Sequence, residues 1–331
     1  MREYGTKAAE VNFQVDLAPW FLRRAVAWYY INRHRFPDRA TKLLSPVFDE
    51  RRRMQQECGE ERWRTEKPDD AIQWIMDGAA KLSKEQQTNK QLTWRLLWLN
   101  FAAIETTSMS TTHALYDIVS HPEYIAPLRE EIIACLDAYG GYTKEALTNM
   151  VKLDSCLRET QRFNTVVSIV MSRVTKRDYT FKSGREPLTL PKGTFVTVPA
   201  AAMHLSTRIY GPDALEWKGF RFSEMREQED NKEGSAKYQA TATSSTYLGF
   251  SHGRHACTGR FFAVYQLKML LSYLLLRYDM RWPMDVDGKR PENVLVTGRR
   301  SADLNAELEF REREEWKDLK YRWGDLEGEK A

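Results

Sequence analysis

The sequence of 331 residues has few cysteines and no long apolar run. Its four cysteines, Cys58, Cys135, Cys156 and Cys257, form no CxxC pair, so neither a structural zinc site nor a secreted disulfide framework is expected. No stretch of 18 or more residues is apolar throughout, and the opening MREYGTKAAEVNF lacks the apolar core of a signal peptide. The sequence therefore predicts no transmembrane segment and no leader.

A strong excess of either charge is also missing. The chain has 50 Lys and Arg against 46 Asp and Glu, which gives a net charge of +4. This balance argues against a dedicated nucleic-acid-binding protein, because such a protein concentrates basic residues on one face. Hydrophobic residues make up 42% of the chain, which excludes wholesale disorder. No glycine-rich flavin or nicotinamide motif is present.

The pattern of apolar residues predicts a mainly α fold with small β-sheets. Helical periodicity bounded by Gly and Pro predicts helices at residues 20–57, 88–120, 127–139, 143–163 and 261–278, the last of them buried. Short β-branched and aromatic runs predict strands between residues 165 and 198 and again from Val294. Polar composition predicts surface loops at 58–70 and 227–245 and a frayed, charged tail at 312–331.

A basic and aromatic segment, WFLRRAVAWYYINRHRF, extends from Trp20 to Phe36. Such a segment can lie on a membrane surface, with its aromatic side chains in the interface and its arginines near the headgroups. It can equally be an amphipathic helix whose apolar face packs on the core, and this second interpretation is the one that we expect.

The most informative segment is FSHGRHACTGR, which surrounds Cys257. Gly253 and Gly259 permit backbone geometry and close approach that other residues forbid. Arg254 and His255 place positive charge beside the sulfur, and the following helix adds the partial positive charge of its N-terminus. This environment favours a thiolate, which could be a nucleophile, a redox sensor or a metal ligand.

The pattern around this cysteine resembles the haem-binding signature of the cytochrome P-450 family. Its five matching positions are Phe250, Gly253, His255, Cys257 and Gly259. The resemblance implies that Cys257 is the axial ligand of a haem b iron. It also implies that Phe250 packs near the sulfur and that His255 holds a haem propionate.

Two further motifs stand earlier in the chain, in the order that the family uses. Glu159 and Arg162 in LRETQR share one helix face and resemble the family's Glu-x-x-Arg motif. The family pairs these residues with a downstream Arg, here Arg221 in WKGFRF. In MSRVTKRD, Arg173 resembles the family's second propionate-binding Arg.

The third motif is AAIETTS, Ala102–Ser108, which resembles the family's oxygen-activation site. A carboxylate and two hydroxyls interrupt an otherwise apolar helix there, at a cost unless they are solvated or hydrogen-bonded. The resemblance implies that Thr106, with Glu105, handles dioxygen and its protons. Substrate contacts are then expected from small or apolar residues, namely Ala102, Val166, Val167 and Ile169.

The resemblance implies a haem-thiolate monooxygenase that inserts one oxygen atom of dioxygen into a small lipophilic substrate. Several segments are most similar to fungal members that oxidise terpenoids, such as the ent-kaurene oxidase type, in secondary metabolism. The implied partner is an NADPH-dependent cytochrome P-450 reductase, with Arg254 and Lys268 as candidate contacts. Full-length relatives are expected at the endoplasmic reticulum membrane.

The oxygen-site motif lies in the first third of this chain, whereas in the family it lies past the middle. Residues 1–311 are therefore expected to be the C-terminal portion of a single cytochrome P-450 domain that lacks its N-terminal part. The alternative function is a non-catalytic remnant, or an incomplete gene model, that keeps the motifs without stable haem binding. A thiol redox sensor would leave Glu159, Arg162, Arg221 and Thr106 unexplained.

Overall fold

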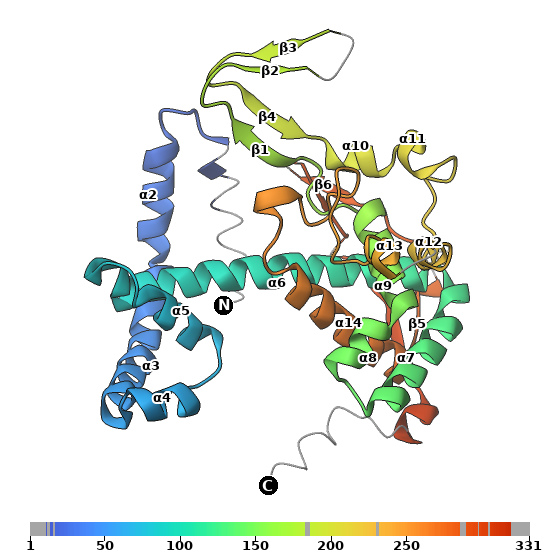
Figure 1. Ribbon diagram of the computed structural model, residues 1–331, viewed down its shortest axis with the longest axis horizontal. Helices are drawn as coiled ribbons and strands as arrows, with labels where there is room; N and C mark the ends of the chain where they lie inside the picture. The colour runs from blue at the N-terminus through green and yellow to red at the C-terminus, as the bar shows by residue number, and fades with distance from the viewer. Residues whose placement is uncertain are drawn as a thin grey trace. The chain divides into compact units, whose positions relative to one another are not determined.

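A computed structural model of the chain describes residues 11, 14–15, 17–182, 186–229, 232–284, 289–296, 298–303 and 305–318 (Figure 1). The chain forms two compact units, Met1–Glu105 and Thr106–Ala331. Helix α6, Asn89–Val119, contributes residues to both. It lies within the range 88–120 in which the sequence predicts a long helix.

The first unit is helical wherever the structure assigns it regular structure. Its elements before α6 are α2 (Arg23–His34), α3 (Phe36–Cys58), α4 (Glu60–Glu66), α5 (Ala71–Ala79) and the 3-10 turn η1 (Lys84–Gln87). Arg35, with φ 49°, separates α2 from α3. The Asp70 carboxylate caps α5 by accepting the Gln73 N–H and also pairs with Arg51 at 2.6 Å. A small core forms around Phe48.

The prediction of a loop at 58–70 is wrong, because α4 lies within that range and its Trp63 is buried. The polar composition of this stretch suggested a loop. It also suits a helix, since Glu60 and Glu61 occupy the first turn and Arg64 the last, where each charge matches the helix dipole.

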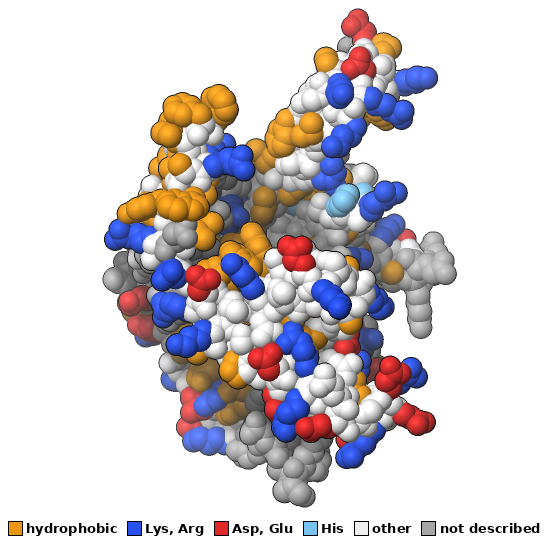
Figure 2. Space-filling model, turned by 90° about the vertical axis from the view of Figure 1, so that its left-hand side faces the viewer, with side chains coloured by type: hydrophobic (Ala, Val, Ile, Leu, Met, Phe, Trp, Pro, Cys, Tyr) orange, Lys and Arg blue, Asp and Glu red, His pale blue; other side chains and the backbone are white. Residues whose placement is uncertain are grey.

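The expectation that Trp20–Phe36 packs on the core through an apolar face is also wrong. Trp20 is 82% exposed, and Phe21, Trp28 and Tyr29 are exposed as well. Figure 2 shows hydrophobic side chains in orange gathered beside Lys and Arg in blue. This helix keeps much of its aromatic surface outside the core of its own unit.

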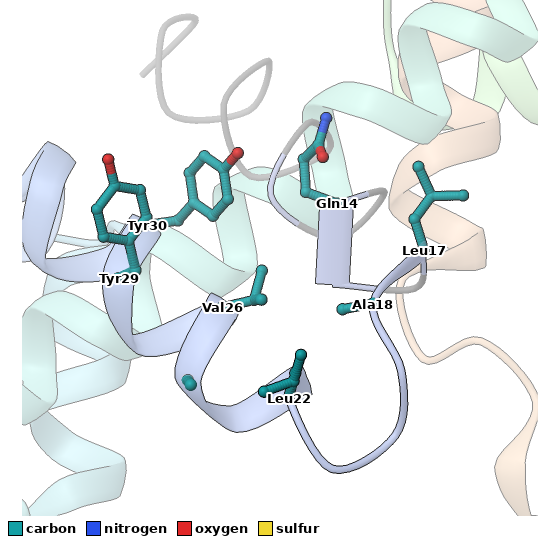
Figure 3. Close-up of a pocket in the computed structure, with 8 residues that line it drawn as sticks. Gln14, Leu17, Ala18, Leu22, Val26, Tyr29 and Tyr30 are labelled. Carbon is teal, nitrogen blue, oxygen red and sulfur yellow. The ribbon is translucent and has the colours of Figure 1, made fainter.

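A shallow apolar cavity of about 560 Å³ lies between α2 and the segment that precedes it. Leu22, Val26, Tyr29 and Tyr30 line it from one side, and Gln14, Leu17 and Ala18 from the other (Figure 3). None of the predicted site residues lines this cavity.

The second unit is built around helices that pack on α14 (Arg260–Arg277). Helices α7 (Ile125–Tyr139), α8 (Lys144–Asn149) and α9 (Val151–Phe163) all contact it. Fully buried leucines and isoleucines from these helices form the main core. The helix predicted at 143–163 is thus two helices, which meet at Met150. The predicted end of a helix at residue 139 is confirmed, because α7 ends at Tyr139 and Gly140 caps it with φ 72°.

In the described part of this unit, four antiparallel pairs of short strands accompany the helices. They are β1 (Val170–Val174) with β4 (Phe195–Val198), β2 (Tyr179–Phe181) with β3 (Leu188–Leu190), β5 (Tyr278–Arg281) with β8 (Glu309–Glu312), and β6 (Val294–Val296) with β7 (Arg299–Ser301). Figure 1 shows the β2–β3 hairpin extending beyond the β1–β4 pair. The predicted mainly α fold with small sheets is confirmed.

Short helices connect these parts, namely η2 (Pro122–Tyr124), α10 (Ala200–His204), α11 (Thr207–Tyr210), α12 (Arg221–Glu227), α13 (Lys232–Ala236), η3 (Gly253–His255) and η5 (Glu314–Asp318). Helix α13 lies inside the predicted loop 227–245, and Ala240 there is buried. Trp316 in η5 is buried too, so residues 312–318 are not the frayed tail that was predicted. The rest of that tail, 319–331, lies outside the described residues.

The side chain of Lys268 is buried in the core of the second unit. Its ammonium group lies 2.7 Å from the Asp154 carboxylate and donates to the Leu147 carbonyl. Asp154 also accepts the Ala240 N–H. The prediction that Lys268 contacts a reductase is therefore wrong, whereas Arg254 is exposed and stays a candidate. The described helices include none that combines the length and the apolarity needed to span a membrane.

Replacing Lys268 with Met should lower the free energy of unfolding by about 3 kcal/mol, since it leaves the Asp154 carboxylate buried without its nearest cation. Urea-induced unfolding followed by circular dichroism measures this change. The exposed Arg254→Met variant is the matched control and should stay within about 0.5 kcal/mol of the parent. Equal midpoints for the two variants would contradict the burial of this ion pair.

Candidate functional site

A buried charge network in the second unit joins α9 to the chain that follows it. The Glu159 carboxylate accepts two hydrogen bonds from Arg162, each 2.7 Å long, and one from Arg221 Nε at 3.1 Å. Glu159 and Arg162 are both fully buried, and Arg221 is 6% exposed. The structure thus brings together the three residues of the second motif, which lie on α9 and α12.

The two arginines of this network also bind backbone carbonyls. Arg162 donates to the carbonyls of His204, Ala214 and Glu216 at 2.7, 2.7 and 3.0 Å. Arg221 adds a 2.8 Å bond to the Asp213 carboxylate, and Lys218 and Arg221 together hold the pKa of that carboxyl at about 2. The network therefore fixes the irregular stretch 204–221, which has little regular structure of its own.

His204 extends this fixed region toward the cysteine loop. Its Nε2 accepts the Leu248 N–H at 2.8 Å, and its Nδ1 lies 2.8 Å from Thr165 Oγ1. Because Nε2 accepts a bond, Nδ1 carries the proton and donates to the hydroxyl. The His204 ring stacks on Tyr247, whose hydroxyl donates to Gln161 Oε1 at 2.7 Å. His204 thus joins the end of α9 to the start of the cysteine loop.

The cysteine loop is held by its own backbone. The Cys257 N–H donates to the Phe250 carbonyl at 2.9 Å, and the Cys257 carbonyl accepts from Arg260 Nη1 at 2.9 Å. Gly253 has φ 72°, a conformation that favours glycine. Helix α14 begins at Arg260, directly after the loop. The backbone N–H and carbonyl of Cys257 are thereby both paired, while its side chain stays exposed.

Cys257 lines a cavity of about 360 Å³ in the second unit. Its walls come from the start of this unit's part of α6, from residues 161–171, from the cysteine loop and from α14. The lining residues are Thr106, Thr107, Ser110, Gln161, Thr165, Val166, Val167, Val170, Met171, Gly249, Phe250, Ser251, His255, Cys257, Ala263 and Leu267. Hydroxyls and one amide face this space together with aliphatic side chains.

The structure places six of the predicted site residues on the wall of this cavity, namely Thr106, Val166, Val167, Phe250, His255 and Cys257. Gly253 and Gly259 flank Cys257 without lining the cavity. Arg173 lies on β1, three residues after the cavity-lining Val170, and its exposed guanidinium donates to the Ser172 carbonyl. Ile169 is 53% exposed and does not line the cavity. Ala102 and Glu105 precede Thr106 on α6 and belong to the first unit.

Sequence reasoning missed several lining residues that a helical pattern could have found. Ser110 follows Thr106 by one turn of α6, and Ala263 and Leu267 are one turn apart on α14. Ser110 Oγ donates to the Thr106 carbonyl at 2.9 Å, a back-bond of the kind expected for hydroxyls in this helix. Gln161 and His204 carried no such signal, because their partners lie far away in the sequence.

Comparison with known proteins decides the family. The family model described as Cytochrome P450 matches residues 1–306. The chain belongs to the cytochrome P450 family. Cytochrome P450 monooxygenase 151 of Postia placenta is 38% identical over 311 residues, covering 94% of this chain and 60% of that relative.

Two more relatives of this cytochrome P450 chain come from other fungi. Cytochrome P450 monooxygenase AN1598 of Emericella nidulans is 37% identical over 283 residues, which are 85% of this chain and 50% of the relative. Ent-kaurene oxidase of Gibberella intermedia is 37% identical over 248 residues, which are 74% of this chain and 45% of the relative. The chain therefore spans about half the length of the curated relatives that it matches.

Members of the cytochrome P450 family hold a haem iron and take electrons from a redox partner. The residues around Cys257 fit such a group. The thiol faces a cavity with aliphatic and aromatic walls, as an axial ligand must. Gly259 has φ −84°, and a Cβ there would meet no protein atom within 4 Å. The space beside Gly259 is therefore open in the described protein and leaves room for a bound group at the cysteine loop.

Burial lowers the pKa of His204 to about 4, from an ordinary value of 6.5. Between these values the unfolded chain binds more protons than the folded one. The free energy of unfolding should therefore fall as the pH decreases from about 6.5 to about 4. His204→Gln keeps a donor and an acceptor, and we expect it to show a shallower fall in urea unfolding midpoints. The same slope in both proteins would contradict the lowered pKa, because it would mean that folded and unfolded His204 take up the second ring proton at the same pH.

Proposed function

We propose that this chain forms the haem-thiolate part of a monooxygenase that inserts one oxygen atom of dioxygen into a lipophilic substrate. The observation that carries the proposal is the exposed Cys257 thiol on the wall of a cavity that also contains Thr106. The names of the relatives support it, because they are fungal monooxygenases and an ent-kaurene oxidase.

The group that we propose is haem b, with the Cys257 sulfur as its axial iron ligand. When bound, haem b would supply the activation of dioxygen. Phe250, packed against the core, would shield the sulfur from water. His255, on the cavity wall, and Arg173, on β1, would neutralise the two propionates by charge-assisted hydrogen bonds.

The part of α6 that reaches the cavity would handle protons. The Thr106 hydroxyl would donate a proton from its Oγ1 to dioxygen in the cavity and regain one from water. Glu105, the preceding residue on α6, would assist this proton transfer as a carboxylate. Ser110 and Thr107 add hydroxyls on the same wall. Val166 and Val167, which are apolar, would orient an apolar substrate. Ala102 and Ile169 are further predicted substrate contacts.

The substrate class that we propose is a terpenoid, since aliphatic residues dominate the 166–171 wall and one relative is named ent-kaurene oxidase. We further propose an NADPH-dependent cytochrome P-450 reductase as electron donor, with the exposed Arg254 beside the cysteine loop as one contact. Attachment to the endoplasmic reticulum membrane is the proposed location, and the exposed aromatic and basic side chains around α2 suit a membrane surface.

Expression of the chain with haem supplied, followed by reduction and addition of carbon monoxide, tests the proposal. A strongly red-shifted Soret band is expected, because an anionic sulfur bound to the haem iron would shift the absorption of the carbon monoxide complex. Cys257→Ala should abolish the shifted band, whereas Cys58→Ala, a cysteine of the first unit, should retain it. Folded protein that takes up no haem would instead favour a remnant that keeps only the motifs.

A further inference from the structure

A second buried polar cluster joins α6 to the C-terminal part of the second unit. From α6 it includes His113, which is fully buried, and Asp117, which is 1% exposed. Arg290 reaches both residues, with its Nη2 2.8 Å from His113 Nδ1 and its Nε 2.6 Å from Asp117 Oδ1. The proposed function uses none of these residues, and none of them lines the cavity at Cys257.

The chemistry of the partners fixes the state of His113. An arginine can only donate hydrogen bonds, so His113 Nδ1 accepts from Arg290. His113 Nε2 must then carry the proton, which it donates to the Arg300 carbonyl at 3.2 Å. The ring is thereby neutral, in agreement with burial, which lowers its pKa to about 4. A doubly protonated ring would point an N–H at the guanidinium of Arg290.

One turn further along α6, Asp117 provides a second attachment. Asn164 Nδ2 donates to both oxygens of Asp117, at 3.0 and 2.8 Å. Asn293 in turn donates to Asn164 Oδ1 at 2.8 Å. The segment 289–301 is thus bound to α6 at two points, and the end of α9 is bound into the same cluster.

This segment pairs with the wall of the cavity through main-chain hydrogen bonds. The Arg300 N–H donates to the Val166 carbonyl at 3.1 Å, and the Ser168 N–H donates to the Gly298 carbonyl at 2.9 Å. Val167 and Arg299 form an antiparallel bridge between these two bonds. Arg300 thus joins the two parts, because its carbonyl accepts a hydrogen bond from His113 and its N–H donates to the Val166 carbonyl.

We propose that His113 is a positioning residue, which by binding Arg290 and the Arg300 carbonyl fixes the segment Gly298–Arg300 against Val166–Ser168 and so sets the cavity wall that selects the substrate. The influence on selectivity rests on the proposed function. The fixing of the wall does not, because it depends only on contacts within this chain.

Hydrogen–deuterium exchange of the purified chain tests the attachment. The leucine in His113→Leu has a volume similar to that of histidine but can bind neither Arg290 nor the Arg300 carbonyl. Amide exchange in peptides covering 166–168 and 298–300 should therefore be at least about tenfold faster in this variant than in the parent. His113→Gln can accept from Arg290 and donate to Arg300, so its exchange should remain near that of the parent. Exchange in β5 and β8 should be unchanged in both variants.

Tyr116→Phe is the matched control. Tyr116 donates from the same helix to the carbonyls of Asp303 and Ala306, beyond the paired strand. It should leave exchange at 166–168 unchanged. Equal amide exchange at 166–168 in His113→Leu and in the parent would overturn the proposal. Exchange there that is accelerated as much by Tyr116→Phe as by His113→Leu would also overturn it, because any lost hydrogen bond of this helix would then have the same result.

If His113→Leu does not fold, nitrogen-15 NMR of the histidine-labelled parent decides the same point, with the His113→Gln spectrum as the assignment. The expected signal at neutral pH is a neutral ring protonated at Nε2. An imidazolium, or a ring protonated at Nδ1, would overturn the proposal, because neither can accept from Arg290.

Binding of imidazole and of the bulkier 4-phenylimidazole to haem-loaded protein tests selectivity. The ratio of their two dissociation constants should change by at least about fivefold in His113→Leu and stay near that of the parent in His113→Gln. An unchanged ratio in His113→Leu would overturn the role in selectivity. Failure of the parent to take up haem would contradict the proposed function, while the exchange experiment would still decide the attachment.

Discussion

The cavity of the second unit depends on one buried carboxylate that is shared by two guanidinium groups. Ion pairs of this kind add little net stability, because removing both charges from water costs about as much as their attraction returns. What Glu159 provides is position, since it orients Arg162 so that the remaining N–H groups reach carbonyls between residues 204 and 216. The irregular chain is thereby held in one conformation, and His204 connects it to the cysteine loop by accepting the Leu248 N–H.

The same principle is repeated in the cluster around Arg290. There Arg290 stands between an imidazole and a carboxylate of α6, and the segment that carries it pairs with residues 166–168. In both places an arginine, fully buried at Arg162 and part-buried at Arg290, joins a regular helix to irregular chain. The cavity walls are therefore positioned by groups that do not line the cavity themselves, and the polar cost of burying these groups is offset by nearly complete hydrogen bonding.

The sequence was sufficient to predict those parts of the fold and of the site whose pattern is local. The glycines and the cysteine of the loop, the spacing of Glu159 and Arg162, and the long helix that carries Thr106 are all visible in short stretches. Burial of Lys268 was not predictable, because its partner Asp154 lies on a different helix far earlier in the chain. The predicted loop at 58–70 failed since charged residues suit both loops and exposed helices. The exposure of Trp20 depends on which surfaces the chain presents to it, and that is a tertiary property.

The wall at residues 166–168 is held by its peptide groups, and Val166 and Val167 line the cavity. Side-chain identity and backbone anchorage are thus separate at the place where a substrate would be recognised. Mutations that enlarge, shrink or reshape this surface leave the bonds to Gly298 and Arg300 in place. Under the proposed function, a substitution at Val166 or Val167 would therefore alter the surface offered to a substrate without loosening the backbone that carries it.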